Sequence, residues 1–275
     1  MINLYFIGRT GIIKFELYFF NKYMTMLNIL FNDLSKALFD DLNKYKKNFY
    51  SQNGEDGIIQ EILIRLNIKN DISSWCCEFG ACDGIRLSNT FFLVKKGWKA
   101  VYIESDRNYY YKLLNTASEY KNICTINSLV DHRKGSQTSL DALLKTTDIP
   151  KNFDILSIDI DSYDCDVWEN LENYKPKIVI IEINSTIPPG ILQRHNNLEK
   201  VGNSFSSTLE VALKKGYILV CHTGNLIFVR KELINLINIK QKYILHPEKL
   251  FDGRYLYNKF IIKLFYKFRN LLLKI

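Results

Sequence analysis

The sequence lacks the features that would place the chain in a membrane or carry it across one. No apolar run reaches the roughly 18 residues that a helix needs to span a bilayer, because Arg9, Lys14 and Glu16 interrupt the apolar N-terminal stretch. There is also no basic start followed by an apolar stretch and a small-residue cleavage site, as a secretory leader would have. We therefore expect a cytoplasmic protein.

Two kinds of sequence fingerprint are also missing. The six cysteines include no Cys-x-x-Cys pair and have no close histidine partners, which argues against a zinc site and for reduced thiols packed as small apolar side chains. Nowhere is there the Gly-x-Gly-x-x-Gly spacing that lets a backbone approach a dinucleotide pyrophosphate. These absences argue against a fold stabilised by a structural zinc ion and against nicotinamide or flavin dinucleotide cofactors.

Basic charge is scarce outside the C-terminal tail. The net charge is +8, yet residues 254–275 alone carry six basic and no acidic residues, so the rest of the chain is nearly neutral. A nucleic-acid partner needs basic side chains spread across a groove or stripe. We therefore expect no nucleic-acid partner.

From Tyr50 onward, short apolar runs alternate with segments of helical periodicity. This alternation predicts a parallel sheet covered on both faces. The last two runs, 217–222 and 225–230, are joined by only Thr223 and Gly224, which requires an antiparallel pair. Strands are predicted at residues 75–79, 100–104, 123–127, 154–159, 177–184, 217–222 and 225–230, and helices at residues 88–96, 108–118, 164–174 and 208–215. The prediction is a Rossmann-like, mostly parallel seven-stranded sheet of the class I methyltransferase type.

Three regions follow from this pattern. Residues 1–48 are predicted to form an N-terminal helical appendage, 49–231 the methyltransferase domain, and 232–275 a helical extension. Within the extension, residues 257–275 place apolar and lysine side chains on opposite faces of a helix. Such a helix either packs on its own domain or lies on an anionic membrane surface, so a peripheral contact at the inner membrane surface is one alternative.

The loop after the first predicted strand has the composition of a ligand-binding loop. It reads EFGACDG over residues 78–84, and glycine lets the backbone approach a ligand closely while the next helix offers free N–H groups. S-adenosylmethionine (SAM) presents an ammonium, a carboxylate and a ribose diol. Glu104, at the end of the second strand, is placed to accept both ribose hydroxyls. The alternative is a plain strand-to-helix turn. The predicted cofactor residues are Glu78, Gly80, Ala81, Asp83, Gly84, Ser88, Asn89, Glu104 and Asp159.

Four segments together resemble the FkbM-type methyltransferases. They are SQNGEDG at 51–57, EFGA at 78–81 with SNT at 88–90, and SIDID at 157–161, within a similarity that spans 49–231, about two thirds of the chain. The resemblance implies a SAM-binding Rossmann-like fold and O-methylation of sugar or natural-product hydroxyls. It implies further that Glu78, Gly80 and Glu104 contact SAM and that Asp159 lies beside the reacting methyl. Residues after 250 lie outside it.

An acidic cluster is predicted where the fourth and fifth strands end. The cluster consists of Asp159, Asp161, Asp164 and Asp166, with Glu182 and Asn184 at the end of the fifth strand. The two strand ends meet at one rim because parallel strands open on the same edge. A carboxylate there, or His195 in the long linker 185–203, can accept the proton of an acceptor hydroxyl. Alternatively, Asp159, Asp161 and either Glu182 or Asn184 bind Mg²⁺, or the acids are structural, with Asp164 capping the next helix. The acidic turn at Gln52, Glu55 and Asp56 is predicted either to cap the pocket or only to begin a helix.

The sequence therefore predicts a SAM-dependent methyltransferase, with Asp159, Asp161 and His195 as candidate catalytic residues and a small-molecule or glycan hydroxyl as acceptor. Two alternatives stay open. Asp159-Ile160-Asp161 also matches the Asp-x-Asp motif of a metal-dependent nucleotide-sugar glycosyltransferase, although that reading leaves the glycine loop and Glu104 without a role. A non-catalytic scaffold with the same fold is the other.

Overall fold

A computed structural model describes residues 42–196 and 202–256. Most of the predicted N-terminal appendage and the whole basic helix predicted at 257–275 lie outside these residues. Within the described ranges no helix is both long enough and apolar enough to cross a bilayer.

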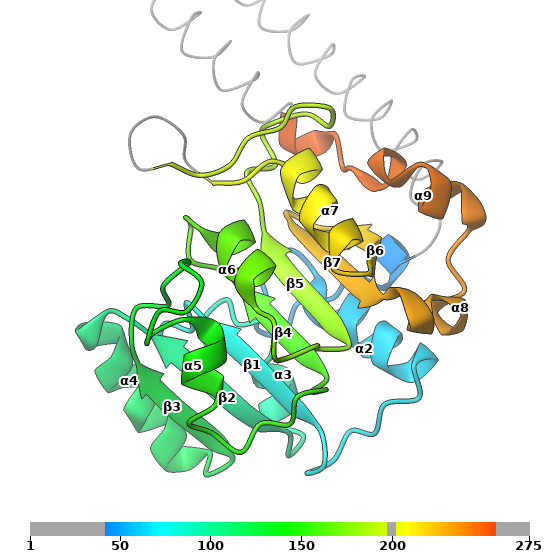
Figure 1. The fold of residues 1–275 in the computed structure, drawn as a ribbon. Helices are drawn as coiled ribbons and strands as arrows, with labels where there is room; N and C mark the ends of the chain where they lie inside the picture. Colours follow the sequence, from blue (N-terminus) through cyan, green and yellow to red (C-terminus); the bar gives the residue numbers. More distant parts are fainter. Residues whose placement is uncertain (1–41, 197–201, 257–275) are drawn as a thin grey trace, which may run out of the picture. The chain divides into compact units, whose positions relative to one another are not determined.

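The core of the molecule is a single mixed sheet (Figure 1). Its strands are β1 (Trp75–Phe79), β2 (Lys99–Glu104), β3 (Ile123–Asn127), β4 (Ile155–Ile158), β5 (Ile178–Glu182), β6 (Tyr217–His222) and β7 (Asn225–Arg230). Their order across the sheet is β3-β2-β1-β4-β5-β7-β6. The first five strands run parallel, whereas β7 is antiparallel to both β5 and β6. The predicted Rossmann-like, mostly parallel seven-stranded sheet is confirmed.

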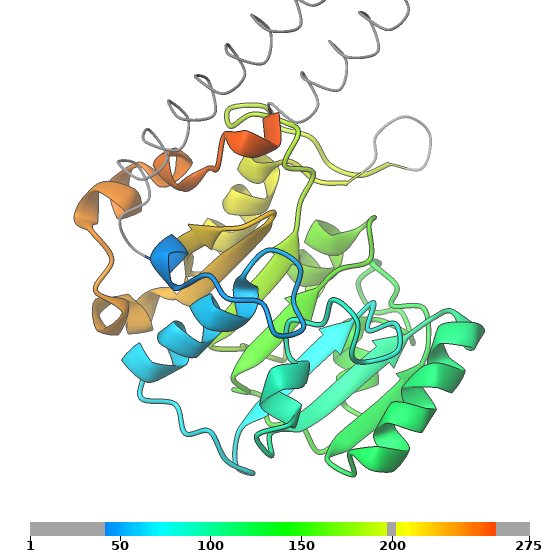
Figure 2. The same ribbon diagram turned by 180° about the vertical axis from the view of Figure 1, so that it is seen from behind.

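Helices cover both faces of this sheet, also as predicted. In Figure 1 the near face carries α5 (Leu140–Leu144), α6 (Asp164–Asn170) and α7 (Phe205–Lys214). Figure 2 shows α2 (Glu55–Arg65), α3 (Phe91–Val94) and α4 (Arg107–Glu119) on the opposite face. With helices on both sides, strands β1, β4 and β5 are buried along nearly their whole length, which explains their continuous apolar sequence.

Two helices are shorter than the sequence pattern predicts. The helix predicted at 88–96 is only α3, because the Ser88 hydroxyl accepts hydrogen bonds from the Thr90 and Phe91 N–H groups and shapes a turn first. The helix predicted at 164–174 ends at Asn170, where the chain turns extended at Leu171. Lys215 donates to the carbonyls of Glu169 and Leu171 and so satisfies groups that a longer helix would have paired.

Segments on either side of the sheet domain belong to the same hydrophobic core. On the N-terminal side, the short 3₁₀ helix η1 (Leu42–Tyr45) buries Leu42. On the C-terminal side, residues 231–250 form η2 (Lys231–Leu233), α8 (Ile234–Ile237), α9 (Gln241–Leu245) and η3 (Pro247–Leu250), which bury Ile237, Tyr243 and Leu250. The folded body therefore continues past residues 49 and 231.

Candidate functional site

Gly80, directly after β1, occupies a position where the surrounding backbone leaves no room for a side chain. Its φ is +75°, and a Cβ there would lie 1.7 Å from the Asp159 carbonyl oxygen after β4. The N–H groups of Gly80 and Ala81 both donate to the Ile103 carbonyl, at 3.1 and 3.2 Å. Gly80 is therefore needed for a close contact between the ends of β1 and β4, whether or not a ligand also approaches it. That Gly80 and Ala81 contact SAM stays a prediction.

The rest of the glycine loop is fixed by internal contacts. Asp83 accepts hydrogen bonds from the N–H groups of Ile85 and Arg86 at 2.9 and 2.8 Å. Gly84 has φ +78°, and a Cβ there would lie 2.7 Å from Leu113 Cδ1. The turn is thus preformed, which holds the predicted cofactor residues Asp83 and Gly84 in one geometry.

Glu78 ties the end of β1 to the start of α3. Its carboxylate is buried and accepts hydrogen bonds from the hydroxyls of Ser88 and Thr90, at 2.8 and 2.5 Å. Burial raises the pKa of Glu78 to about 7, although these hydrogen bonds oppose the rise. Asn89 meanwhile donates from its side chain to Ser157 Oγ at 3.1 Å. The predicted SAM contacts of Glu78, Ser88 and Asn89 would be made by groups already fixed in place.

Glu104, at the carboxyl end of β2, is a buried and oriented carboxylate. One oxygen accepts from Cys82 N–H and the other from Asp106 N–H, both at 2.7 Å. Only 5% of the residue is exposed. Each carboxylate oxygen keeps a second lone-pair direction, so Glu104 can still accept two hydroxyls of a ligand.

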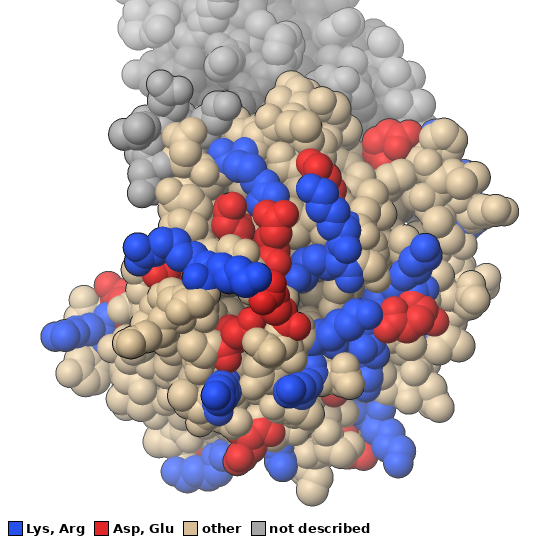
Figure 3. Space-filling model, viewed as in Figure 1, with Lys and Arg blue, Asp and Glu red and all other residues tan. Residues whose placement is uncertain are grey.

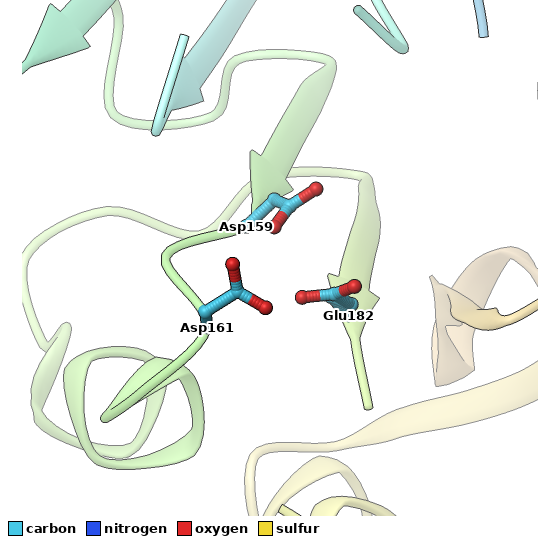
Figure 4. A group of neighbouring side chains, drawn as sticks. All are labelled: Asp159, Asp161 and Glu182. Carbon is cyan, nitrogen blue, oxygen red and sulfur yellow. The ribbon is translucent and has the colours of Figure 1, made fainter. Parts of the chain in front are cut away.

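The predicted acidic cluster is assembled as expected (Figure 4). Asp159 and Asp161 follow β4, Glu182 ends β5, and an oxygen atom of each lies within 4.8 Å of the others. Burial and the neighbouring negative charges raise the pKa of Asp159 to about 6 and that of Glu182 to about 10. The two carboxyls are coupled, so the pair shares a proton at neutral pH, which a bound cation would displace.

The loop that presents these acids is held by Asp164. Its buried carboxylate accepts from the N–H groups of Ile160 and Ser162, both at 2.9 Å. Asp161 between them has φ +56°, a left-handed conformation that is uncommon for a residue with a side chain. The structural alternative for Asp164, a cap on the following helix, is wrong, since its side chain holds the preceding loop and α6 has no side-chain cap.

A cavity of about 360 Å³ opens beside the acidic cluster. Of the predicted site residues, Asn89, Asp159, Asp161 and Glu182 line it, whereas Glu104, His195 and the loop 80–84 do not. The cavity therefore lies over the β4, β5 and β7 side of the carboxyl edge. Its other lining residues are Gln52, Asn53, Leu87, Asp164, Ile183, Asn184, Ser185, Thr186, Gly202, Gly224, Asn225 and Tyr255.

The acidic turn before α2 joins the N-terminal side of the domain to this cavity. Asp56 accepts from three consecutive N–H groups, those of residues 49–51, at 2.6 to 2.9 Å. Glu55 accepts from Thr223 Oγ1 at 2.7 Å and from Asn225 Nδ2 at 3.1 Å, at the β6–β7 turn. These bonds hold the turn in which Gln52 and Asn53 line the cavity.

His195 lies in the described part of the linker 185–203 but outside the cavity lining. Its Nδ1 accepts from Gly202 N–H at 3.2 Å, and its ring meets the edge of the Tyr163 ring at 4.8 Å between centroids. His132 stacks on the same tyrosine at 3.8 Å. A catalytic role for His195 stays a prediction.

Ser185 and His222 form a buried pair that sequence reasoning did not find. Ser185 Oγ lies 2.9 Å from His222 Nε2. Asp252 N–H donates to His222 Nδ1 at 2.7 Å, so Nδ1 has no proton and Nε2 carries it. Nε2 then donates to the serine, which donates to the Gly224 carbonyl at 3.1 Å. The imidazole is therefore not a base for Ser185, and the pair is structural.

The state of His222 makes stability depend on pH. Burial lowers the pKa of His222 to about 3, with Lys46 and Arg254 lowering it and Asp252 opposing. A histidine whose folded-state pKa is depressed stabilises the fold fully above about pH 6.5 and loses this contribution as the pH falls toward 3. We expect the free energy of unfolding to drop by on the order of 2 kcal/mol between about pH 7.5 and 5 from this group. Denaturant titrations at both pH values measure it.

The variant His222→Gln is the reference for this measurement. Glutamine keeps an N–H donor near Ser185 but has no proton to bind, so its stability should change less between the two pH values than that of the parent. Equal changes in both proteins would assign the pH dependence to other groups.

Surface charge on the face shown in Figure 3 alternates in sign. Among the described residues, several lysines and arginines pair with acids, as in Lys134–Glu172 at 2.6 Å, Arg194–Glu169 at 2.9 Å and Lys214–Glu210 at 2.8 Å. No continuous basic stripe is visible on this face.

Comparisons with known proteins find similar folds only. No family model matches the chain, and no curated protein matches it. Among solved structures, the N-terminal domain of EvdMO1 in the presence of SAH and D-fucose is 9% identical, with 72% of this chain and 94% of that chain covered and a TM-score of 0.43. A putative caffeoyl-CoA O-methyltransferase from Staphylococcus aureus is 14% identical, with 75% and 96% covered and a TM-score of 0.41. Aeropyrum pernix fibrillarin with bound SAM is 12% identical, with 62% and 74% covered and a TM-score of 0.41.

Proposed function

We propose that this chain is a SAM-dependent methyltransferase that methylates a hydroxyl oxygen of a sugar, glycan or related small acceptor. The observation that carries the proposal is the cavity at the carboxyl edge of the sheet, where Asp159, Asp161 and Glu182 converge next to the loop after β1. In a parallel sheet this edge is where ligands bind. The resemblance of four segments to FkbM-type methyltransferases supports the same reaction.

The cofactor half of the site is assigned to the carboxyl ends of β1 and β2. Glu104 is buried, oriented by two N–H groups, and retains acceptor capacity for the ribose hydroxyls. Glu78 or Asp83 would supply the carboxylate that pairs with the ammonium of SAM. Bound SAM supplies an electrophilic methyl group on a sulfonium. The residues of the loop act by holding that group in one orientation, which lowers the entropic cost of reaching the transition state.

The acceptor half is assigned to the cavity. A hydroxyl is a poor nucleophile until its proton is removed, and Asp159 is the carboxylate in position to accept that proton. Glu182 lies beside Asp159, and the two carboxyls share a proton because burial and the neighbouring negative charges raise the pKa of both. Asp161, on the loop fixed by Asp164, is the third acid that faces the acceptor.

The same three oxygens fit a hard divalent cation. Asp159, Asp161 and Glu182 offer oxygen ligands within 4.8 Å of one another, the donor type that Mg²⁺ prefers. A bound cation would replace the proton shared by Asp159 and Glu182 and would acidify the acceptor hydroxyl. The glycosyltransferase alternative uses the same acids, but gives no role to Glu104 or to the loop 80–84.

The proposal is tested by separating SAM affinity from turnover. We expect Asp159→Asn and Asp161→Asn to bind SAM, measured by calorimetry, within about twofold of the parent. Their release of S-adenosylhomocysteine in the presence of acceptor should fall by roughly 100-fold or more, because the base or cation ligand acts on the acceptor. Repeating the assay with chelator, then with Mg²⁺ restored, distinguishes the two mechanisms.

Asp148→Asn is the matched control, since Asp148 is an exposed acid outside the cavity. It should retain full turnover. Absence of SAM binding to the parent protein would refute the methyltransferase proposal and favour a scaffold or a glycosyltransferase. Undiminished turnover in chelator would remove the Mg²⁺ role and leave the base.

A further inference from the structure

The residue that closes the acceptor cavity comes from the C-terminal extension. Tyr255 lines the cavity together with Asn53, Gly224 and Asn225. These residues arrive from segments about 200 positions apart in the chain, and the sequence pattern gave no reason to join them. Tyr255 also lies beyond the region that resembles the methyltransferase family.

The side chain of Tyr255 is fixed in place at the cavity by contacts with neighbouring residues. Its hydroxyl donates to the Thr223 carbonyl, and its ring lies 5.2 Å from the His222 ring. Phe251 and Asp252, a few residues earlier in the chain, are fixed to the same histidine. Asp252 N–H donates to His222 Nδ1, and the Phe251 ring stacks on the imidazole at 4.8 Å between centroids. With the hydroxyl engaged by Thr223, what Tyr255 offers to a ligand is chiefly its ring.

Gly224 shows how closely this corner is packed. A Cβ on Gly224 would lie 3.0 Å from Asn53 Nδ2 and 3.1 Å from Tyr255 Oη. Asn53, Tyr255 and the β6–β7 turn therefore form one continuous surface. An aromatic ring beside amide side chains is a pairing that binds a sugar, since the ring covers an apolar C–H face while the amides bond to hydroxyls.

The charge of the residues that line the cavity limits the class of ligand that it can bind. Four of the lining residues are Asp or Glu, and among the described residues that line it none is Lys, Arg or His. A phosphate or carboxylate on the acceptor would find no cation here and would be repelled by Asp161 and its neighbours. An acceptor without negative charge fits.

We propose that Asn53, Asn225 and Tyr255 form an acceptor subsite that binds a neutral sugar ring, with Tyr255 as a specificity-determining residue. This inference rests on the proposed methyl transfer for its catalytic readout. The binding itself does not depend on SAM. The segment that begins as a C-terminal extension is then part of the active site.

The first test measures binding and turnover with defined probes. Saturation-transfer NMR with methyl glycosides of glucose, galactose and mannose should show binding to the parent protein, and S-adenosylhomocysteine release should be detected with at least one of them. Glucuronate and glucose 6-phosphate should give neither. Binding or turnover confined to these anions, or absent for every neutral glycoside, would overturn the subsite.

The second test uses Tyr255→Phe and Tyr255→Ala on the best glycoside, with Tyr111→Ala as the control because Tyr111 is 67% exposed on α4. Loss of the ring in Tyr255→Ala should raise the acceptor KM by roughly tenfold or more. Its kcat and SAM Kd should stay within about threefold of the parent. Tyr255→Phe should keep a near-parental KM, although it loses the bond to Thr223.

The variant Tyr255→Phe distinguishes a role of Tyr255 in binding the acceptor from a role only in holding the β6–β7 turn. A role confined to holding the β6–β7 turn would impair Tyr255→Phe as much as Tyr255→Ala, and an unchanged KM in Tyr255→Ala would equally refute the subsite. If the parent binds glycosides but not SAM, the proposed reaction fails while the subsite stands. If it binds SAM but no glycoside, the subsite fails alone.

Discussion

Gly80→Ala is expected to leave little folded protein. The added Cβ would lie 1.7 Å from the Asp159 carbonyl oxygen, so the ends of β1 and β4 would have to move apart. A backbone atom cannot rotate away as a side chain can. We expect a loss of about 4 kcal/mol or more in the free energy of unfolding, in the range reserved for severe core disruptions. Soluble yield and thermal unfolding measure it.

Gly135→Ala isolates the steric part of this effect. Gly135 has φ +76°, almost the same as the +75° of Gly80, but a Cβ there meets nothing within 4 Å. Gly135→Ala should therefore cost only the roughly 1–2 kcal/mol of a left-handed alanine. Similar losses at both positions would mean that the contact between Gly80 and Asp159 does not constrain the fold.

Glu104→Ala should reduce SAM affinity by roughly 100-fold or more. Two charge-assisted hydrogen bonds to the ribose hydroxyls would be lost, each contributing about 1.5–3 kcal/mol. The substitution also frees the N–H groups of Cys82 and Asp106 that Glu104 now holds. Glu104→Gln keeps an acceptor of the same shape without the charge, and we expect it to weaken binding by an intermediate factor. Calorimetry with SAM on folded protein measures both.

Glu119→Ala, in the last turn of α4, serves as the control because this glutamate is exposed. It should bind SAM like the parent. If Glu104→Ala and Glu104→Gln did so as well, the cofactor assignment would be wrong.

The sheet was predictable because its strands can be recognised from local sequence features, namely apolar runs and the length of the links between them. Ile178-Val179-Ile180-Ile181 is apolar on both faces and is buried completely, and the two-residue link between 222 and 225 permitted only an antiparallel hairpin. Helix ends were less predictable. The turn at Ser88 and the end of α6 depend on hydrogen bonds between side chains and backbone groups, made by Ser88 and Lys215. The spacing of apolar residues does not predict such bonds.

The acidic cluster was predictable for a topological reason, and the cavity wall was not. Asp159 and Glu182 end neighbouring parallel strands, so their meeting follows from strand order alone. Ser185 meets His222, and Asn53 and Tyr255 both come close to Gly224, only through tertiary packing of segments far apart in the chain. Nor did the sequence reveal that Gly80 faces the protein's own backbone, since glycine is equally compatible with approach to a ligand.

The position of β7 between β5 and β6 has a consequence for synthesis on the ribosome. Strand β7 is the last to be made, yet it alone covers the outer edge of β5. Until residue 230 has emerged, the apolar strand Ile178–Glu182 has an open edge that another chain can pair with. β6 likewise has no partner within the described sheet before β7 arrives. A nascent chain stalled between these strands therefore leaves the edge of β5 open to pairing with another chain.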